Sequence, residues 1–486
     1  MPSSPDISTL TPHAPNVGKP ASRRGALVSL SLAMGLSSLS ASIATIALPA
    51  LTQAFAAPFQ HVQWIVIAYL LAITAAIVSV GRLGDIVGRR KLLLAGLALF
   101  TGASAACAMA PTLWLLVAAR GAQGLGAAVM MALTMAMISE NVPKDRTGSA
   151  MGLLGTMSAI GTGLGPSLGG LLLAWAGWRA IFLVNVPVGI LALWMTARFL
   201  PADRMSARQA GQRFDIEGTL LLAATLAAFT LAMTVGKGHF GGVNLVLLIA
   251  AFVGMGLFLA VEGRVSSPLI RLSVFADLEF SAGLAATAAS MVAMMTTMIV
   301  GPFYLAVGLG LGAVAIGLIM SVGPAISMAG GVFAGRIVDA VGASLIVLVG
   351  LTAMASGSVL MCILPLVFGV AGYVGATFIL SSGYILFQAA NNAAIMSDVA
   401  AGERGVISGM LSLSRNLGLI AGASVMGALF AHAVGAVEIA TAAPAAVAAG
   451  MRLTFGVVAA LLVVAVASVL AARRLAHRQT ELKTLV

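Results

Sequence analysis

Two arginines stand inside long apolar segments, where a charged side chain indicates a function. Arg120 lies about 10 Å from the nearer end of its segment at a helical rise of about 1.5 Å per residue, and Arg415 lies about 13 Å into another. A charge at that depth is costly in lipid and marks a site for a substrate, an ion or a polar partner. We expect Gln123, one turn away, to hold the Arg120 guanidinium. The alternative for both arginines is structural: they bond carbonyl oxygens at a helix bend.

No acidic side chain accompanies these arginines. All 15 Asp and Glu residues fall in expected loops, tails or segment ends, and none of the 5 His is central in an apolar segment. Because a proton carrier in the membrane needs a titratable group, proton coupling would fall to a loop or segment-end acid. The unbalanced arginines favour neutral or anionic compounds over cations in a cavity. The candidate proton acceptors are Asp85, Glu140, Glu217 and Asp277.

A basic loop occurs twice in the chain. The segment 81–91 reads GRLGDIVGRRK between two apolar segments, and a degenerate copy, GRIVDAVG, occupies 335–342. Glycines permit a tight turn between helices, and the aspartate can cap a helix or pair with arginines. The repeat indicates two related halves with this loop on the same membrane face in each; a loop that only sets topology is the alternative. The candidate residues are Gly81, Asp85, Gly88, Arg89 and Asp339.

A string of small residues, G-x-x-x-G-P-x-x-G-G, begins at Gly161. Gly161, Gly165 and Gly169 are spaced at i, i+4 and i+8, so they line one helix face and allow close backbone approach. Pro166 frees a carbonyl oxygen and bends the helix. With Gly170, the string predicts a bending hinge, and ordinary small-residue packing is the alternative.

Other polar side chains in apolar segments are candidates for lining a cavity near the bilayer midplane. Polar groups in lipid-embedded helices also bond across helices, so each has a structural alternative. Tyr304 falls near the outer end of its segment, where tyrosine often anchors a helix at the interface. The candidates are Ser40, Thr45, Gln123, Tyr304, Tyr384, Gln388, Asn391 and Asn392.

Methionine and cysteine indicate packing more than chemistry. The run Met291, Met294, Met295 and Met298 suits an adaptable apolar pocket or plain core filling, of which we favour filling. The only cysteines, Cys107 and Cys362, both lie in apolar segments, and their spacing fits neither a disulfide framework nor a metal site.

Membrane-spanning helices must position these residues. The chain is 60% hydrophobic and 8% charged with a net charge of +11, whereas soluble domains average about 25% charged residues. Its basic residues lie singly or in short clusters between apolar segments, so they indicate orientation in a bilayer, not nucleic-acid binding. The sequence lacks a phosphate-binding G-x-x-x-x-G-K-[ST] loop, a catalytic triad and metal-ligand spacing, so we expect neither an enzyme nor a cofactor.

Segments of about 20 apolar residues can cross the hydrocarbon as helices, and the sequence contains fourteen. With the N-terminus inside, most of the 26 Lys and Arg residues fall on the cytoplasmic side, which predicts cytoplasmic termini. The expected spans are 26–50, 62–80, 92–110, 113–137, 148–175, 180–198, 217–236, 243–262, 281–306, 311–334, 343–363, 367–395, 407–431 and 453–472.

Over about 26 to 472 the chain resembles the major facilitator superfamily, in its fourteen-span drug/proton antiporter branch. The loop 81–91 is similar to the signature after the second span, LVAARGAQGLG at 116–126 to the fourth-span motif, and 161–170 to the fifth-span antiporter motif. The resemblance implies an all-α membrane fold that works by alternating access, with Asp85 as a cytoplasmic latch that stabilises the outward-facing state. It also implies export of small hydrophobic organic compounds, driven by proton antiport.

The same resemblance implies the domain organisation. We expect two six-helix bundles with an inserted helix pair between them. The divisions are a disordered cytoplasmic tail 1–25, an N-terminal bundle 26–200, a cytoplasmic linker and inserted helix pair 201–275, a C-terminal bundle 276–472 and a cytoplasmic tail 473–486.

One departure from the family bears on function. Many members carry an aspartate in the first span, and Ser40 stands in its place here. A uniporter, an importer of an organic anion and a non-transporting membrane sensor are therefore alternatives to the antiporter. The expected partners are a small-molecule substrate, protons and the lipid bilayer of a bacterial-type inner membrane, without nucleic acid.

Overall fold

The computed structural model describes residues 23–141, 147–201, 216–235, 241–263, 277–397, 404–435 and 439–484. Within these ranges nearly every residue is helical and no strand occurs, which confirms the all-α expectation. Twelve of the described helices are long and apolar enough to cross a membrane. Of the predicted tail 1–25, only 23–25 are described, and they begin the first helix.

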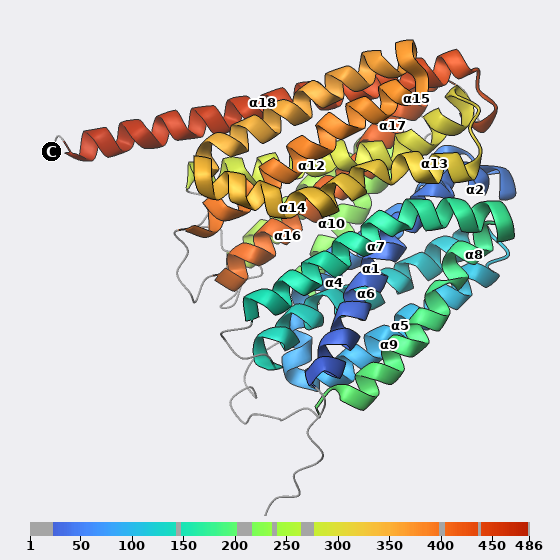
Figure 1. Cartoon of the computed structure of the whole chain (residues 1–486), viewed down its shortest axis with the longest axis horizontal. Helices are drawn as coiled ribbons and strands as arrows, with labels where there is room; N and C mark the ends of the chain where they lie inside the picture. Colours follow the sequence, from blue (N-terminus) through green and yellow to red (C-terminus); the bar gives the residue numbers. More distant parts are fainter. Residues whose placement is uncertain are drawn as a thin grey trace, which may run out of the picture.

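The N-terminal bundle packs α1 along α7, and α6 along α4 and α5 (Figure 1). Pro49 and Pro187 lie just inside the N-termini of α2 and α9, where a missing backbone N–H costs little. One span is therefore divided into α1 and α2, and another into α8 and α9. The bundle comprises α1 (Arg23–Ile46), α2 (Leu48–Ala54), α3 (Phe59–Val62), α4 (Trp64–Val87), α5 (Arg89–Met109), α6 (Leu113–Asn141), α7 (Thr147–Ala176), α8 (Trp178–Leu183) and α9 (Asn185–Phe199).

The C-terminal bundle is built around α12, which packs on α15, α16 and α18. Pro302 near the end of α12 precedes a π-helical turn, and Pro324 follows the break between α13 and α14. The bundle comprises α12 (Leu278–Phe303), η4 (Tyr304–Gly308), α13 (Ala313–Met320), α14 (Val322–Val341), α15 (Ala343–Ser397), α16 (Arg404–Ala421), η5 (Gly422–Met426), α17 (Gly427–Val434), η6 (Ile439–Thr441) and α18 (Pro444–Thr484).

Helix α15 is a hairpin of two antiparallel arms. Gly369 has φ 54°, a conformation that suits glycine, and the chain reverses there. Glycines let the arms approach closely, since a Cβ on Gly350 would lie 2.5 Å from the Phe387 nitrogen. The twelve long apolar helices count this hairpin once. Counting it as two spans and adding the shorter apolar helix Gly218–Thr234 gives a total that is compatible with the expected fourteen. The count of fourteen stays a prediction.

Helices α10 (Ile216–Thr234) and α11 (Gly242–Glu262) form a pair between the two bundles in the sequence. α10 runs antiparallel to α4: Trp64 Nε1 donates to Thr234 Oγ1 at 3.1 Å, and the hydroxyls of Ser79 and Thr219 are hydrogen-bonded. α10 also contacts η5 of the C-terminal bundle, whereas α11 packs on α10. The pair therefore lies across one side of the seam between the bundles.

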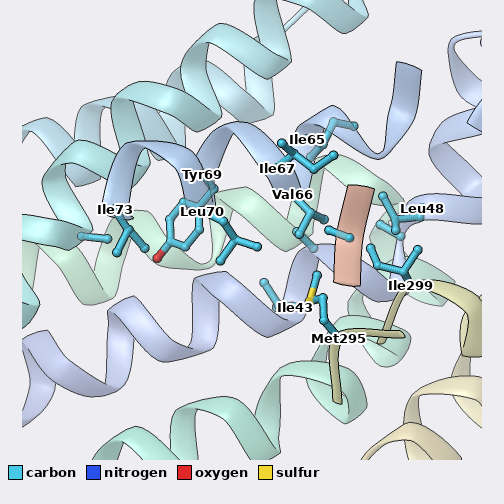
Figure 2. Close-up of a cluster of buried hydrophobic side chains, with 14 of the residues drawn as sticks. Ile43, Leu48, Ile65, Val66, Ile67, Tyr69, Leu70, Ile73, Met295 and Ile299 are labelled. Atoms are coloured by element: carbon cyan, nitrogen blue, oxygen red, sulfur yellow. The ribbon is translucent and has the colours of Figure 1, made fainter. Parts of the chain in front are cut away.

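The hydrophobic core joins the two bundles at one end of the molecule. The largest core cluster runs from α1 and α4 into the end of α12 and α17, and Figure 2 shows Met295 and Ile299 of α12 beside Ile43 and Val66. The other two clusters contain only residues of the C-terminal bundle. We call the end with α2, α3 and α17 the sealed end, and the opposite end, where α4 meets α5 and α14 meets α15, the basic end.

Candidate functional site

Three phenylalanines and one glutamine close the sealed end. Phe59 of α3 lies edge-on to Phe303 of α12 and to Phe430 of α17, with ring centroids 5.0 and 6.0 Å apart. Beside them the Gln63 side chain contacts Gly427 across the seam. Gln63 is completely buried, and both its amide oxygen and its amide nitrogen lack a hydrogen-bond partner. The seal is thus apolar with a single unsatisfied amide at its centre.

The glycine string of α7 packs on α1 through one face. Gly161, Gly165 and Gly169 all point at α1, and a Cβ on either of the first two would collide with the Gly35 carbonyl oxygen or the Ser42 hydroxyl. The i, i+4, i+8 spacing therefore produces the close backbone approach that the sequence predicts. This contact lies within the N-terminal bundle.

A second face of the same string crosses to the C-terminal bundle. A Cβ on Gly170 would lie 2.5 Å from the carbonyl oxygen of Ala313, and one on Gly317 would lie 2.5 Å from the carbonyl oxygen of Pro166. Helix α7 continues through Pro166 without interruption. The string thus holds α1 on one side and α13 on the other; a bending role stays a prediction.

A small pocket in the C-terminal bundle borders this seam. Its volume is about 10 Å³, enough for about one water, and Pro324 in its wall lies 3.5 Å from where a Cβ on Gly163 of α7 would be. The hydroxyls of Thr377 and Ser381 are buried there without partners. We call it the Met-lined pocket; its walls include Met294, Met298, Met320, Tyr373, Thr377 and Ser381.

Sequence reasoning named two of the methionines in this pocket but neither hydroxyl. Tyr373, Thr377 and Ser381 are spaced at i, i+4 and i+8, so a polar stripe on an otherwise apolar span was available as a signal. The lack of partners could not be read from the sequence, because the facing groups belong to α12, α13 and α14.

Arg120 lies inside the N-terminal bundle, with no exposed surface. Its Nε donates to the Ile65 carbonyl oxygen at 2.9 Å, and one terminal nitrogen donates to Ser40 Oγ at 3.1 Å and to Gln123 Oε1 at 2.6 Å. The Tyr69 ring lies 4.1 Å from the guanidinium carbon. No carboxylate among the described residues contacts it, and its other terminal nitrogen has no partner.

The expected contact of Gln123 with Arg120 is therefore present, but the expected exposure to a cavity is not. Ser40, Arg120 and Gln123 are all completely buried, because the guanidinium satisfies oxygens of three helices. Substrate contact by these residues stays a prediction.

The polar candidates of the C-terminal bundle separate into different surroundings. Tyr384, Gln388, Asn392 and Arg415 are partly exposed, and the Arg415 Nε is buried without a partner. Asn391 is buried and donates to Thr287 Oγ1 at 2.9 Å. It lines a cavity of about 270 Å³ near the basic end, together with Asp277, Glu279 and Arg473.

Tyr304 lies under the α15 hairpin. It is buried, its hydroxyl donates to the Pro365 carbonyl oxygen at 3.1 Å, and its ring stacks on Tyr373. It is therefore not exposed at the interface, and its role in a substrate cavity stays a prediction.

The two copies of the basic loop adopt the same turn. Gly88 between α4 and α5 has φ 103°, and Gly342 between α14 and α15 has φ 97°. Asp339 is exposed, while the Asp85 side chain lies outside what is described. Arg90 donates to the Ala197 carbonyl oxygen at 2.6 Å, near the end of α9. The repeat is thus present in the structure as well as in the sequence. The role of this loop as a latch stays a prediction.

Comparison with known proteins agrees with this architecture. The family model of the Major Facilitator Superfamily matches residues 30–423. The chain belongs to this superfamily. It is 32% identical to an uncharacterised transporter, YebQ, of Escherichia coli strain K12 over 83% of this chain and 88% of the relative. It is also 32% identical to the multidrug resistance protein Stp of Mycobacterium tuberculosis, over 83% of this chain and 75% of that relative. It is 30% identical to the riboflavin transporter RibZ of Clostridioides difficile, over 84% of this chain and 88% of that relative.

Solved structures share the fold of this superfamily member. A bacterial homologue of the lysosomal transporter Spinster, in an inward-facing conformation, superposes with a TM-score of 0.66 at 16% identity over 94% of this chain and 98% of that one. The nucleoside transporter NupG gives 0.64 at 12% identity over 92% and 99%. The family match and the apolar helices together show that the chain is a multi-pass membrane transporter, and the solved structures show its fold.

Proposed function

We propose that this transporter exports small hydrophobic organic compounds across a bacterial inner membrane by alternating access, with both termini in the cytoplasm and protons moving in the opposite direction. The observation that carries the proposal is the double packing of the glycine string, on α1 through one face and on α13 through the other. A single helix that closely contacts both bundles can pass a movement of one bundle to the other. The relatives named as multidrug resistance proteins support efflux.

The Met-lined pocket supports a substrate that is mainly apolar. Methionine side chains adapt to different shapes, and the free hydroxyls of Thr377 and Ser381 can bind one polar group of a ligand. Arg415, partly exposed in the same bundle, favours a neutral or anionic compound over a cation. In the sealed conformation the pocket has room for about one water, so substrate entry would require the bundles to part at this seam.

A uniporter is the second candidate, and the positions of the acids favour it. The acidic side chains that the structure describes, Asp277, Glu279 and Asp339, are all exposed and at helix ends. For an antiporter we propose Asp277 and Glu279 as proton acceptors, since both line the cavity that reaches the buried Asn391. We also propose Asp85 and Asp339 as the latch of the basic end.

A proton-flux assay separates these candidates. The purified protein is placed in liposomes that contain a pH-sensitive dye, a pH gradient is imposed, and cationic, neutral and anionic compounds are added in turn. Antiport predicts proton flux that depends on neutral or anionic substrate. Substrate movement without protons would instead establish a uniporter. The double variant Thr377→Val with Ser381→Ala should weaken transport of compounds that carry a polar group, with smaller effect on purely apolar ones.

A further inference from the structure

Two arginines of α18 are separated by the thickness of a bilayer. Arg452 and Arg473 lie 21 residues apart on one continuous helix, which is about 31 Å at a rise of about 1.5 Å per residue. The hydrocarbon layer of a bilayer is about 30 Å thick. When Arg473 at the basic end lies at one edge of this layer, Arg452 lies at the other edge, level with the lipid head groups.

The guanidinium of Arg452 has no protein partner at that level. Its side chain is exposed, and no described residue forms a hydrogen bond or ion pair with it. A cation beside hydrocarbon is unfavourable unless an anion or water accompanies it. The phosphate of a lipid is the anion that every bilayer supplies at this depth.

A groove of about 760 Å³ adjoins Arg452 on the outer flank of the C-terminal bundle, where α18 runs beside α15 (Figure 1). Apart from Arg452, its lining side chains are apolar or small. Leu453 and Val457 are exposed in it, as is Leu366 of the α15 hairpin. Exposed apolar side chains on this flank are suited to contact with acyl chains.

We propose that this groove binds one phospholipid, with its phosphodiester on Arg452 and one acyl chain along Gly456 and Val457 toward the bilayer centre. On the other side of Arg452, Ala445 and Ala448 leave room for the rest of the head group. The guanidinium forms charge-assisted hydrogen bonds with phosphate oxygens. A neutral compound would leave the Arg452 charge unpaired, so a phospholipid fits the groove better than a neutral compound does. The site does not depend on the direction of transport.

The bound lipid would link α18 to the α15 hairpin. Leu366 lies three residues before the reversal at Gly369, and the Arg452 carbonyl oxygen accepts from Cys362 Sγ at 3.3 Å. A lipid between Leu366 and Arg452 therefore extends a contact that already joins the hairpin to α18. We expect phospholipid to stabilise the folded protein through this site.

Native mass spectrometry of the delipidated full-length protein, titrated with phosphatidylglycerol, tests the proposal. Arg452→Gln should lose one tightly bound lipid per chain, with binding weakened about tenfold, and should lose the matching part of the thermal stabilisation by lipid. Arg452→Lys should retain the lipid, because lysine also pairs with phosphate. Gly456→Leu should displace the lipid while Arg452 remains, since a Cβ at Gly456 meets no atom within 4 Å and a leucine can fill the groove.

Arg179→Gln is the matched control. Arg179 is also an exposed arginine near the sealed end, but its guanidinium stacks on Trp178 at 4.4 Å and lies outside this groove. It should keep the full lipid count. Equal lipid binding by the Arg452→Gln and Arg179→Gln variants would overturn the site, as would retention of diacylglycerol, which lacks phosphate, as strongly as phosphatidylglycerol.

Discussion

At the scale of single residues, Arg120 shows how a buried cation is held without a carboxylate. Carbonyl and hydroxyl oxygens from α1 and α4, the Gln123 amide and the Tyr69 ring replace the missing anion. The contact with Gln123 could be predicted, because it lies one turn away on the same helix. The contacts with Ser40 and Ile65 could not, because they depend on how α1, α4 and α6 pack.

The first prediction concerns this arginine. Arg120→Ala should lower the thermal stability and reduce transport of cationic, neutral and anionic compounds by a similar factor, because it leaves the buried Ser40 and Gln123 groups unpaired at about 1–3 kcal/mol each. Arg120→Lys should rescue little, since an ammonium cannot reproduce the planar fork. Thermal unfolding and liposome transport measure both effects. A loss confined to anionic substrates would instead assign Arg120 to the substrate cavity.

The second prediction concerns Gln63. An amide that is buried without partners destabilises the conformation that buries it by about 1–3 kcal/mol, so the sealed end should open more readily with Gln63 than without it. Gln63→Leu should shift the population toward the sealed conformation by about tenfold, measured as the distance between spin labels on α2 and α17. Gln60→Leu is the control, because Gln60 lies three residues earlier, in α3, and is buried, but neither polar atom of its amide is fully buried without a partner. Equal label distances in both variants would contradict the prediction.

At the scale of elements, the glycine string could be predicted as a close-contact face but not as a contact with two helices. Its i, i+4, i+8 positions indicate one face, and this face packs on α1. Gly170 and Pro166 lie on another face, and their partner α13 follows more than 140 residues later in the chain. Only the packed structure brings Gly317 to Pro166.

The third prediction tests that contact between the bundles. Gly317→Ala places a methyl group 2.5 Å from the Pro166 carbonyl oxygen, so α7 and α13 must separate. We expect reduced transport and a shift away from the sealed conformation, with the fold of each bundle retained. Gly331→Ala is the matched control on α14, since a Cβ there meets no atom within 4 Å. If both variants transport equally well, the seam is not coupled to the transport cycle.

At the scale of the whole molecule, the helical class and the related halves could be predicted, because hydropathy and the repeated loop report on local segments. Gly88 and Gly342 indeed adopt nearly the same backbone conformation. The place of α10 across the seam could not be predicted. It depends on hydroxyl and indole contacts, such as Trp64 with Thr234, between helices far apart in the sequence.

The shape of the core leads to the last prediction. The joint core at the sealed end holds the bundles together there, whereas toward the basic end two core clusters belong to the C-terminal bundle alone. Alternating access requires the sealed end to part during each cycle. In a chain without Cys107 and Cys362, a short thiol cross-linker should therefore join Phe59→Cys to Phe430→Cys and block transport. If the linker contains a disulfide, adding a reductant should cleave it and restore transport.

The matched pair lies within one bundle. Phe303→Cys with Phe430→Cys joins α12 to α17, whose rings are 6.4 Å apart, against 6.0 Å for the pair that crosses the seam. Its cross-link should leave transport largely intact, because these two helices move together when the bundles rock. Since the two pairs share Phe430 and differ little in spacing, loss of one aromatic ring or of local packing affects them alike. Transport that continues across the Phe59–Phe430 link would mean that the sealed end stays closed, and would contradict alternating access through this seam.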